Sequence, residues 1–333
     1  MTAVMRSNRR RSAAYQPSGD LVPKVLAGSR PDIARLISRA EAEYAEASEA
    51  LGEIYRHAGR AHIVGITGVP GGGKSTLISA LIGAFSAAGS KVAVIAIDPS
   101  SPYSGGAILG DRIRMGDSAE ANRAFVRSMA TRGHLGGLAR PTLQAVDILD
   151  AAGYSPIFIE TVGVGQDEVE VVTAAHTVVV LSPPGLGDDI QAIKAGVMEI
   201  ADIHAVSKAD RPEAAATVAA IKGMMTLGSD VKGSSWTPPV LPLSASTGEG
   251  VADLKQAIDS HRQHLADSGE LATRQRAICK HRILVAIDQL VRRRFDDGTE
   301  GLSEQLQAVV ERKSDPQSAA GSLLASEKAG HGR

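Results

Sequence analysis

The chain has 333 residues, of which 43% are hydrophobic and 22% are charged, and its formal net charge is −1. This length and composition exclude a wholly disordered protein and allow about two domains with ordinary hydrophobic cores. The near-zero charge gives no support to nucleic-acid binding, which usually needs a basic excess. The single cysteine, Cys279, excludes an internal disulfide framework and is typical of a reducing compartment such as the cytoplasm.

Residues 1–58 are predicted to form a flexible arm followed by helices. Residues 1–30 begin with a basic stretch and end in a Gly/Ser/Pro-rich one, which is typical of a disordered arm. An Arg/Ser-rich transit peptide is the alternative, and a secretory signal is not expected because no apolar segment follows the arginines. From Pro31 to Ala58 apolar residues recur at helical spacing, and proline suits the first turn of a helix.

A βαβ rhythm follows over residues 59–262. Six short runs are apolar at nearly every position, which is typical of strands buried on both faces of a parallel sheet, and longer helical stretches separate them. The pattern predicts an α/β domain with a doubly wound, mostly parallel sheet. The six runs are 62–66, 92–97, 157–159, 177–181, 203–206 and 240–243.

Residues 263–333 are predicted to be helical again. The stretch 271–295 carries apolar residues at helical spacing, and the pattern continues after a glycine-containing break. The residues from Ser314 on are small and polar and are expected to fray. Because this region is too small for a core of its own, we expect it to pack on the α/β domain or on a second copy of the chain.

Residues 68–76, Gly-Val-Pro-Gly-Gly-Gly-Lys-Ser-Thr, form a complete G-x-x-x-x-G-K-S phosphate-binding loop (P-loop) between a predicted strand and a predicted helix. Glycines let consecutive backbone N–H groups surround phosphates, and the helix N-terminus adds a positive dipole end. Lys74 is expected to reach the β- and γ-phosphates, and the Ser75 hydroxyl to bind Mg²⁺. The predicted nucleoside triphosphate site includes Gly71, Gly72, Gly73, Lys74, Ser75 and Thr76.

Three acidic residues are candidates for the metal site and for hydrolysis. Asp98 ends the second predicted strand, so we expect it to point into the same crevice as the P-loop; capping a helix is the alternative. Asp111 follows in a glycine-rich loop, where a plain turn residue is the alternative. Glu160 ends the third strand at the place of a Walker B carboxylate, and a buried strand-end acid is the alternative. Gln166, six residues further on, is a candidate for positioning water.

A guanine-recognition segment is predicted after the fifth run. Residues 207–210, Ser-Lys-Ala-Asp, resemble the Asn-Lys-x-Asp motif of GTPases. In that motif Asp210 would accept hydrogen bonds from guanine and Lys208 would cover the face of the base, while a strand-end turn is the alternative. Ser207 stands where Asn is usual, and its shorter side chain is expected to affect affinity more than base identity. Ser244, Ala245 and Ser246 match the Ser-Ala loop whose backbone N–H reads guanine O6.

These motifs together resemble the MeaB/ArgK GTPases, the chaperones of adenosylcobalamin-dependent methylmalonyl-CoA mutase. The resemblance rests on the P-loop and on the strings at residues 96–115, 127–139 and 160–166. It implies a homodimer formed through the C-terminal helical arm, with Mg·GTP bound and slowly hydrolysed. It also implies roles in phosphate binding, metal binding and hydrolysis for Lys74, Ser75, Asp98, Asp111 and Glu160.

The resemblance assigns residues 183–202 to a switch loop that relays the nucleotide state to the mutase, with Gln191 and Lys194 at the matched positions. An amphipathic helix with a capping Asp pair is the alternative, and both interpretations are compatible. Asp167 departs from the family, where Ser is common, and adds a negative charge near the expected γ-phosphate. Together with Ser207, it leads to the hypothesis of a divergent paralogue that serves a different B12-dependent acyl-CoA mutase.

The leading hypothesis is therefore a cytoplasmic, Mg²⁺-dependent GTPase that binds GTP or GDP and regulates an adenosylcobalamin-dependent acyl-CoA mutase. The first alternative is a nucleotide-gated protein-binding module with vestigial hydrolysis. The second is a P-loop kinase or ATPase linked to amino-acid transport, which needs an acceptor-binding lid and a base. The expected partners are the mutase and a second copy of the chain. Neither nucleic acid nor membrane is expected, since no apolar run approaches the ~18–20 residues of a membrane span.

Overall fold

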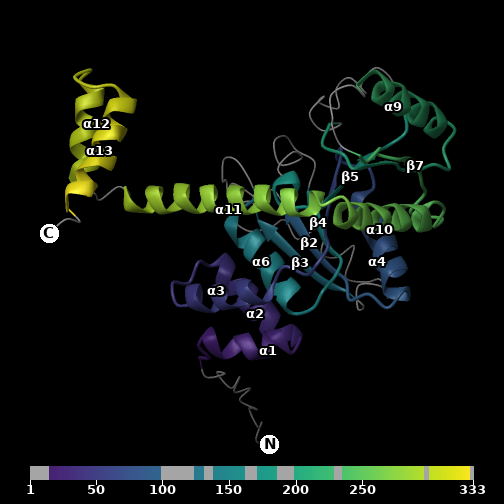
Figure 1. The fold of residues 1–333 in the computed structure, drawn as a ribbon, viewed down its shortest axis with the longest axis horizontal. Coiled ribbons are helices and arrows are strands. Elements are labelled where there is room, and N and C mark those ends of the chain that lie inside the picture. Colours follow the sequence, from purple (N-terminus) through teal and green to yellow (C-terminus); the bar gives the residue numbers. More distant parts are fainter. Residues whose placement is uncertain are drawn as a thin grey trace, which may run out of the picture. The chain divides into compact units, whose positions relative to one another are not determined.

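The computed structural model describes residues 15–98, 124–130, 138–161, 171–185, 199–228, 235–295 and 300–330. The chain divides into two compact units, Met1–Arg276 and Ala277–Arg333. In the first unit, helices cover both faces of a parallel β-sheet (Figure 1). Within the described ranges, no helix is both long and apolar enough to cross a membrane.

The sheet has seven parallel strands in the described part of the chain, in the order β3-β2-β4-β1-β5-β6-β7. The chain moves from the central strand β1 to one side, returns to β4, and continues on the other side with β5. Ligands of such sheets bind at the carboxyl ends of the strands, where this direction reverses. The architecture confirms the predicted doubly wound α/β fold. The strands are β1 Ile63–Thr67, β2 Ala93–Asp98, β3 Phe125–Ala130, β4 Ile157–Thr161, β5 Thr177–Ser182, β6 Ile203–Val206 and β7 Val240–Pro242.

Successive residues of the central strands pack into two different cores. In β5, Val178 and Val180 belong to the core covered by α2, α3 and α6, whereas Val179 and Leu181 belong to the core covered by α4 and α10. This double burial explains why the strand sequences are apolar at nearly every position. The covering helices are α2 Arg30–Glu41, α3 Ala47–His57, α4 Lys74–Ala87, α6 Arg140–Ala151 and α10 Val251–Asp267, with η2 Val171–Thr173 and α9 Ala214–Gly228 completing the sheet's connections.

The N-terminal helices start earlier than predicted. A short helical segment, η1 Gly19–Leu21 followed by α1 Val22–Leu26, precedes α2. Leu21, Val22 and Val25 are all buried in the same core as α2 and α3. The prediction of a flexible arm up to residue 30 is therefore wrong for residues 19–26. The segment was missed because it is too short to show a repeated helical pattern.

The edge strand β3 was also missed by the search for apolar runs. Its sequence, Phe-Val-Arg-Ser-Met-Ala, is interrupted by Arg127 and Ser128. Arg127 is partly exposed and its guanidinium donates to the carboxylate of Glu41 and to the hydroxyl of Ser38, both in α2. An edge strand with one such polar contact does not need the continuous apolar pattern of a central strand.

The C-terminal region consists of three helices. α11 (Glu270–Arg294) begins in the first unit and continues into the second, where α12 (Glu300–Val310) and α13 (Pro316–Gly330) pack against each other. The prediction that the residues from Ser314 on fray is wrong for residues 316–330, which form α13. Asp315 caps this helix through hydrogen bonds from the backbone N–H groups of Gln317 and Ser318. Large apolar side chains are exposed on these helices: Ile283, Leu284, Ile287, Leu290, Val291, Leu306, Val310 and Leu324.

Candidate nucleotide-binding site

The P-loop connects the carboxyl end of β1 to the first turn of α4, as predicted. Its first residue must be glycine, because a Cβ atom at Gly68 would lie 2.1 Å from the carbonyl oxygen of Leu181 in β5 and φ is +139°. Gly73 caps α4 in a left-handed conformation with φ +97°. The backbone N–H groups of the first turn of α4 are therefore presented at the carboxyl edge of the sheet, where an anion binds favourably.

Lys74 is the first residue of α4 and its side chain is 7% exposed. Its Nζ donates hydrogen bonds to the carbonyl oxygens of Gly68 at 2.7 Å and Val69 at 3.1 Å, so the side chain extends back along the loop. A buried ammonium group at this place supplies a positive charge where phosphates would lie. The role of Lys74 at the β- and γ-phosphates stays a prediction.

Ser75 and Glu160 are brought together from distant parts of the sequence. The Ser75 hydroxyl donates a hydrogen bond of 2.7 Å to Oε1 of Glu160, which is 4% exposed at the end of β4. Glu160 pairs with Ile66 of β1 in the sheet, two residues before the P-loop begins at Gly68. A hydroxyl and a carboxylate are oxygen donors of the kind that Mg²⁺ prefers, and Mg²⁺ completes its shell with water and phosphate oxygens. The two residues therefore fit a magnesium site.

The remaining predicted metal-site residues are described only in part. The backbone of Asp98 ends β2, whose residues Ala96 and Ile97 pair with Glu160 and Thr161 of β4. Asp98 thus lies at the same edge of the sheet as Glu160. The other predicted residues of this region, Asp111, Gln166, Asp167, Gln191 and Lys194, lie outside the described residues.

The predicted guanine-recognition segment follows β6 at the same edge of the sheet. Lys208 adopts a left-handed conformation with φ +52°, and its Nζ donates a 3.2 Å hydrogen bond to the carbonyl oxygen of Gly71 in the P-loop. This contact joins the segment to the phosphate loop. Ser207 is buried, and its backbone N–H donates to the carbonyl oxygen of Ser182 at 2.9 Å, which extends the pairing of β5 and β6.

Asp210 and the Ser244–Ser246 loop are also brought together. The Ser244 hydroxyl donates a hydrogen bond to the Asp210 carboxylate, and this bond is the main cause that lowers the pKa of Asp210. The Ser244 hydroxyl lies 3.1 Å from that of Ser246, and the N–H of Ala209 donates to the carbonyl oxygen of Leu243 at 3.0 Å. The exposed Asp210 is therefore held ionised, as an acceptor of two N–H groups must be.

Sequence reasoning did not single out Thr67 and Thr161. Their side-chain hydroxyls form a 3.0 Å hydrogen bond between the carboxyl ends of β1 and β4, and both residues are fully buried. The bond lies between the residue before the P-loop and the residue after Glu160. The available signal was a threonine at the end of each of two apolar runs, which by itself predicts no partner.

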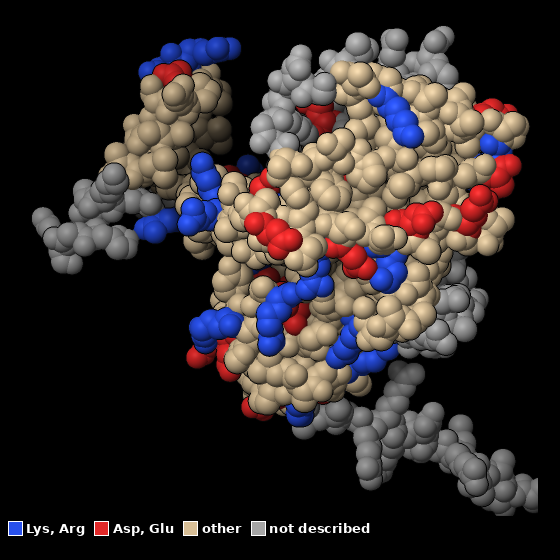
Figure 2. All heavy atoms as spheres, turned by 45° about the vertical axis from the view of Figure 1, so that its right-hand side comes forward, with Lys and Arg blue, Asp and Glu red and all other residues tan. Residues whose placement is uncertain are grey.

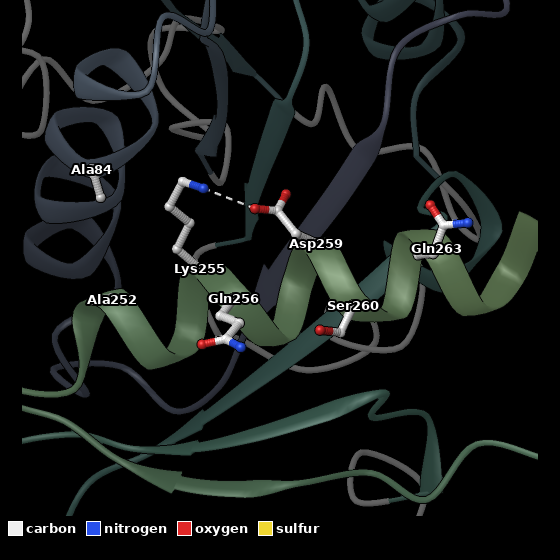
Figure 3. A pocket seen from close by; sticks show the side chains of 7 residues that line it. All are labelled: Ala84, Ala252, Lys255, Gln256, Asp259, Ser260 and Gln263. Atoms are coloured by element: carbon white, nitrogen blue, oxygen red, sulfur yellow. Dashed lines mark hydrogen bonds and ion pairs between the residues drawn. The ribbon is translucent and has the colours of Figure 1, made fainter.

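The surface of the first unit shows a hollow of about 510 Å³ between α4 and α10, lined by Ala84, Lys255, Asp259 and Gln263 among others (Figure 3). Lys255 and Asp259 form an ion pair of 2.8 Å with each other. Ala84 lies ten residues after Lys74 in α4, so the hollow is remote from the P-loop. On the face in Figure 2, acidic and basic side chains are interspersed over this unit. Neither feature extends the candidate site.

Comparison with known proteins decides the family. A family model described as methylmalonyl-CoA mutase-associated GTPase MeaB matches residues 33–299, which include the P-loop, Glu160 and the guanine-recognition segment. The chain belongs to the MeaB family. It is therefore a P-loop GTPase, and membership of this family implies guanine nucleotide binding.

Relatives of this MeaB-family GTPase align with it over most of their length. A putative GTPase of Pyrococcus horikoshii is 43% identical over 314 residues, which cover 93% of this chain and 98% of the relative. The GTPase ArgK of Escherichia coli is 37% identical over 257 residues, which cover 75% of this chain and 77% of ArgK. A crystal structure of a LAO/AO transport system kinase matches with a TM-score of 0.68 at 25% identity, covering 93% of this chain and 97% of that one.

Proposed function

We propose that this MeaB-family GTPase binds Mg·GTP, hydrolyses it slowly, and acts as a chaperone and regulator of an adenosylcobalamin-dependent acyl-CoA mutase of the methylmalonyl-CoA mutase type. The observation that carries the proposal is the Ser75–Glu160 hydrogen bond at the start of α4, with the guanine-recognition segment tied to the same loop by Lys208 and Gly71. The family description names the mutase, which supports this class of partner. A cytoplasmic location fits the single cysteine of the chain.

Each proposed site residue has a specific task. The P-loop backbone at Gly71, Gly72 and Gly73 and the side chain of Thr76 surround the phosphates with Lys74. Ser75, Asp98, Asp111 and Glu160 hold Mg²⁺ or its water, and Glu160 orders the attacking water. Bound Mg²⁺ supplies charge neutralisation at the phosphates. Ser207, Lys208 and Asp210, with the backbone at Ser244, Ala245 and Ser246, recognise guanine.

The nucleotide site is tested most directly by Lys74→Ala. Removal of this buried ammonium group is expected to weaken Mg·GTP and Mg·GDP binding by about two orders of magnitude, since truncating one member of a buried charge pair costs ~2–5 kcal/mol. Isothermal titration measures the affinity. Lys255→Ala, which removes a lysine from the hollow on α10, is the matched control and should bind as the unmodified chain does. Retained GDP affinity in Lys74→Ala would exclude the proposed site.

The mutase role is tested by single-turnover GTP hydrolysis with and without adenosylcobalamin-dependent mutases. We expect a mutase to accelerate hydrolysis, and a pull-down to retain it differently with GDP and with a non-hydrolysable GTP analogue. Binding without acceleration would favour the nucleotide-gated binding module. Residues 183–202 are the proposed contact, of which residues 186–198 lie outside the described part of the chain.

A homodimer through the C-terminal helices is part of the proposal. Ile283, Ile287 and Leu290 recur at helical spacing on α11 and are 60%, 49% and 64% exposed among the described residues, so they form an apolar stripe on this helix. Light scattering after size-exclusion chromatography should give a dimer, and Ile287→Glu should give a monomer. The control Gln289→Glu introduces a glutamate on the other side of α11, and this variant should remain dimeric.

A further inference from the structure

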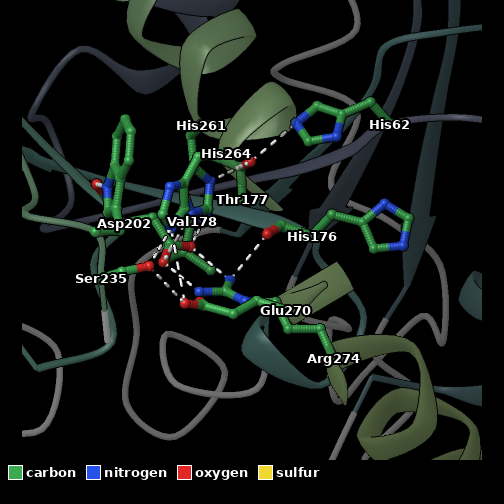
Figure 4. Close-up of polar contacts among 11 residues, drawn as sticks. His62, His176, Thr177, Val178, Asp202, Ser235, His261, His264, Glu270 and Arg274 are labelled. Carbon is green, nitrogen blue, oxygen red and sulfur yellow. Dashed lines mark hydrogen bonds and ion pairs between the residues drawn. The ribbon is translucent and has the colours of Figure 1, made fainter. Parts of the chain in front are cut away.

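A cluster of polar side chains lies at the edge of the sheet where the strands begin (Figure 4). We call His62, Thr177, Asp202, His261 and Arg274 the strand-start cluster. His62 directly precedes β1, Thr177 begins β5 and Asp202 directly precedes β6. Because the strands are parallel, this edge is opposite to the one that carries the P-loop.

Asp202 and Arg274 form the centre of the cluster. The two guanidinium Nη atoms of Arg274 donate to the two carboxylate oxygens of Asp202 at 2.7 and 2.5 Å, a bidentate pair. The backbone N–H of Val178 donates to the same carboxylate at 2.8 Å, and Arg274 also donates to the carbonyl oxygen of His176 at 2.8 Å. Trp236 completes the site by donating from Nε1 to the backbone oxygen of Asp202 at 2.8 Å.

Arg274, and not a histidine of the cluster, supplies the positive charge that balances Asp202. Nε2 of His261 lies 3.5 Å from Asp202, but burial lowers the pKa of His261 to about 4, so its ring is neutral at neutral pH. Burial acts to lower the pKa of Arg274, but the hydrogen bonds to Asp202 and the negative charges of Asp202 and Glu270 together outweigh it, and the net shift is upward. Removing Arg274, whose side chain is 30% exposed, would leave the charge of Asp202, whose side chain is 9% exposed, uncompensated, which is costly.

The Asp202–Arg274 pair joins the residue before β6 to the first turns of α11. Arg274 lies in the first turns of α11, one helical turn before Ala277, where the second unit begins. Asp202 directly precedes β6, a strand of four buried residues whose other end leads directly to Ser207 and Lys208. The Asp202–Arg274 pair and the guanine-recognition segment thus lie at the two ends of β6, a short and tightly packed strand.

We propose that Arg274 is a positioning residue whose bonds to Asp202 hold the first turns of α11 on the strand starts, and that guanine nucleotide at the strand ends strengthens this hold. The second half of the inference rests on the proposed nucleotide site. A change in the backbone at Lys208 reaches Asp202 through the four residues of β6. All four pair with β5, and the last three also pair with β7. By linkage, loosening the pair must also weaken nucleotide binding.

Cys279 provides the test, because it is the single cysteine of the chain, is exposed, and lies in α11 five residues after Arg274. A nitroxide attached to it reports the mobility of the helix by electron paramagnetic resonance in the full-length protein. We compare Arg274→Met with Arg276→Met, which removes the same charge from an exposed position two residues further on. Each protein is measured without nucleotide, with Mg·GDP and with Mg²⁺ and a non-hydrolysable GTP analogue.

We expect Arg274→Met to increase the mobile component of the spectrum several-fold and to make it independent of nucleotide. The unmodified chain and Arg276→Met should show less mobility with nucleotide than without. Arg274→Met should also bind GDP about fivefold more weakly, the reciprocal of the coupling. If Arg274→Met does not fold, as judged by circular dichroism, Arg274→Lys keeps the charge without the bidentate geometry and should show intermediate mobility.

Two results would overturn the inference. One is a nucleotide-free spectrum of Arg274→Met or Arg274→Lys equal to that of the unmodified chain, which would show that Arg274 does not hold the first turns of α11. The other is a spectrum of the unmodified chain that is the same with and without bound nucleotide, which removes the coupling. Failure of the unmodified chain to bind guanine nucleotide in titration would instead overturn the proposed function, together with the coupling, while the nucleotide-free comparison still decides the hold.

Discussion

The hydroxyl of Ser75 and the carboxylate of Glu160, which are 85 residues apart in the sequence, form a hydrogen bond of 2.7 Å. The bond joins the first turn of α4 to the carboxyl end of β4. It places a hydroxyl and a carboxylate side by side, two oxygen donors of the kind that Mg²⁺ prefers.

Glu160→Gln tests the carboxylate. The amide oxygen of glutamine can still accept the bond from Ser75, but the negative charge that attracts Mg²⁺ is lost. We expect the Mg²⁺ concentration needed for half-maximal hydrolysis to rise, and the single-turnover rate to fall, by about 10–100-fold. GDP binding in the absence of Mg²⁺ should be unchanged, which serves as the control for folding. A normal rate at low Mg²⁺ would show that Glu160 has no part in the metal site.

The strands around this pair could be predicted from the sequence because each central strand is buried on both faces. The residues from Val178 to Leu181 pack alternately into two cores, so every position of this strand must be apolar and the sequence shows an uninterrupted apolar run. The P-loop was predictable for a related reason, since backbone geometry at Gly68 admits no other residue. The edge strand β3 carries Arg127 in contact with Glu41, a partner that no local pattern indicates.

The strand-start cluster could not be predicted from the sequence. Its residues come from the starts of three strands and from two helices, and the separation between His62 and Thr177 alone is 115 positions. No spacing rule connects such positions, because the contacts exist only after the sheet has set its strand order. The same holds for the contact of Lys208 with Gly71, where the motif predicted both loops but not the bond between them.

Asp210→Asn tests base recognition. The carboxylate, held ionised by Ser244, is replaced by an amide that presents a donor to the N1–H and amine of guanine. We expect GTP affinity to fall by about 10²-fold or more and xanthosine triphosphate affinity to rise, since xanthine carries an acceptor where guanine carries the amine. Competition titration of the two nucleotides measures the preference. An unchanged preference would remove Asp210 from the base pocket.

Three of the buried histidines, His62, His176 and His261, predict a dependence of stability on pH. Burial lowers the pKa of His62 to about 3 and of His176 and His261 to about 4. In the unfolded chain these groups titrate near ~6.5, so below that pH the unfolded state binds protons that the folded state excludes. The contribution of these histidines to the free energy of unfolding is therefore constant above pH ~6.5. It falls as the pH is lowered toward about 4, by up to ~1.4 kcal/mol per pH unit for each histidine.

Urea unfolding at several pH values between about 7.5 and 5 measures this loss. His62→Gln removes one of the three groups and should reduce the slope of stability against pH over this range, whatever its effect on the stability at pH 7.5. His57→Gln, at an exposed position in α3, is the matched control and should keep the slope of the unmodified chain. Equal slopes for His62→Gln and the unmodified chain would contradict the assignment of a lowered pKa to His62.

Ser207→Asn tests the departure from the guanine motif. The Ser207 hydroxyl is buried and has no hydrogen-bond partner among the described residues. Because Ser207 follows Val206, which pairs with Ser182 in the sheet, its side chain points to the opposite face from that of Ser182. That face is the one where Ala205 packs in the core covered by α4, whose first residues form the phosphate site. An asparagine amide at position 207 would reach further toward the P-loop than a hydroxyl does.

We therefore expect Ser207→Asn to bind GDP and GTP about three- to tenfold more tightly, the gain of roughly one hydrogen bond. The preference for guanine over xanthine should stay the same, because Asp210 is unchanged. Ser182→Asn is the matched control: its hydroxyl is also buried without a partner among the described residues, but it lies on the other face, so the variant should lower the melting temperature without any gain in affinity. Weaker or equal nucleotide binding by a normally folded Ser207→Asn would show that this serine is the better residue for the site, and that the chain has adapted around it.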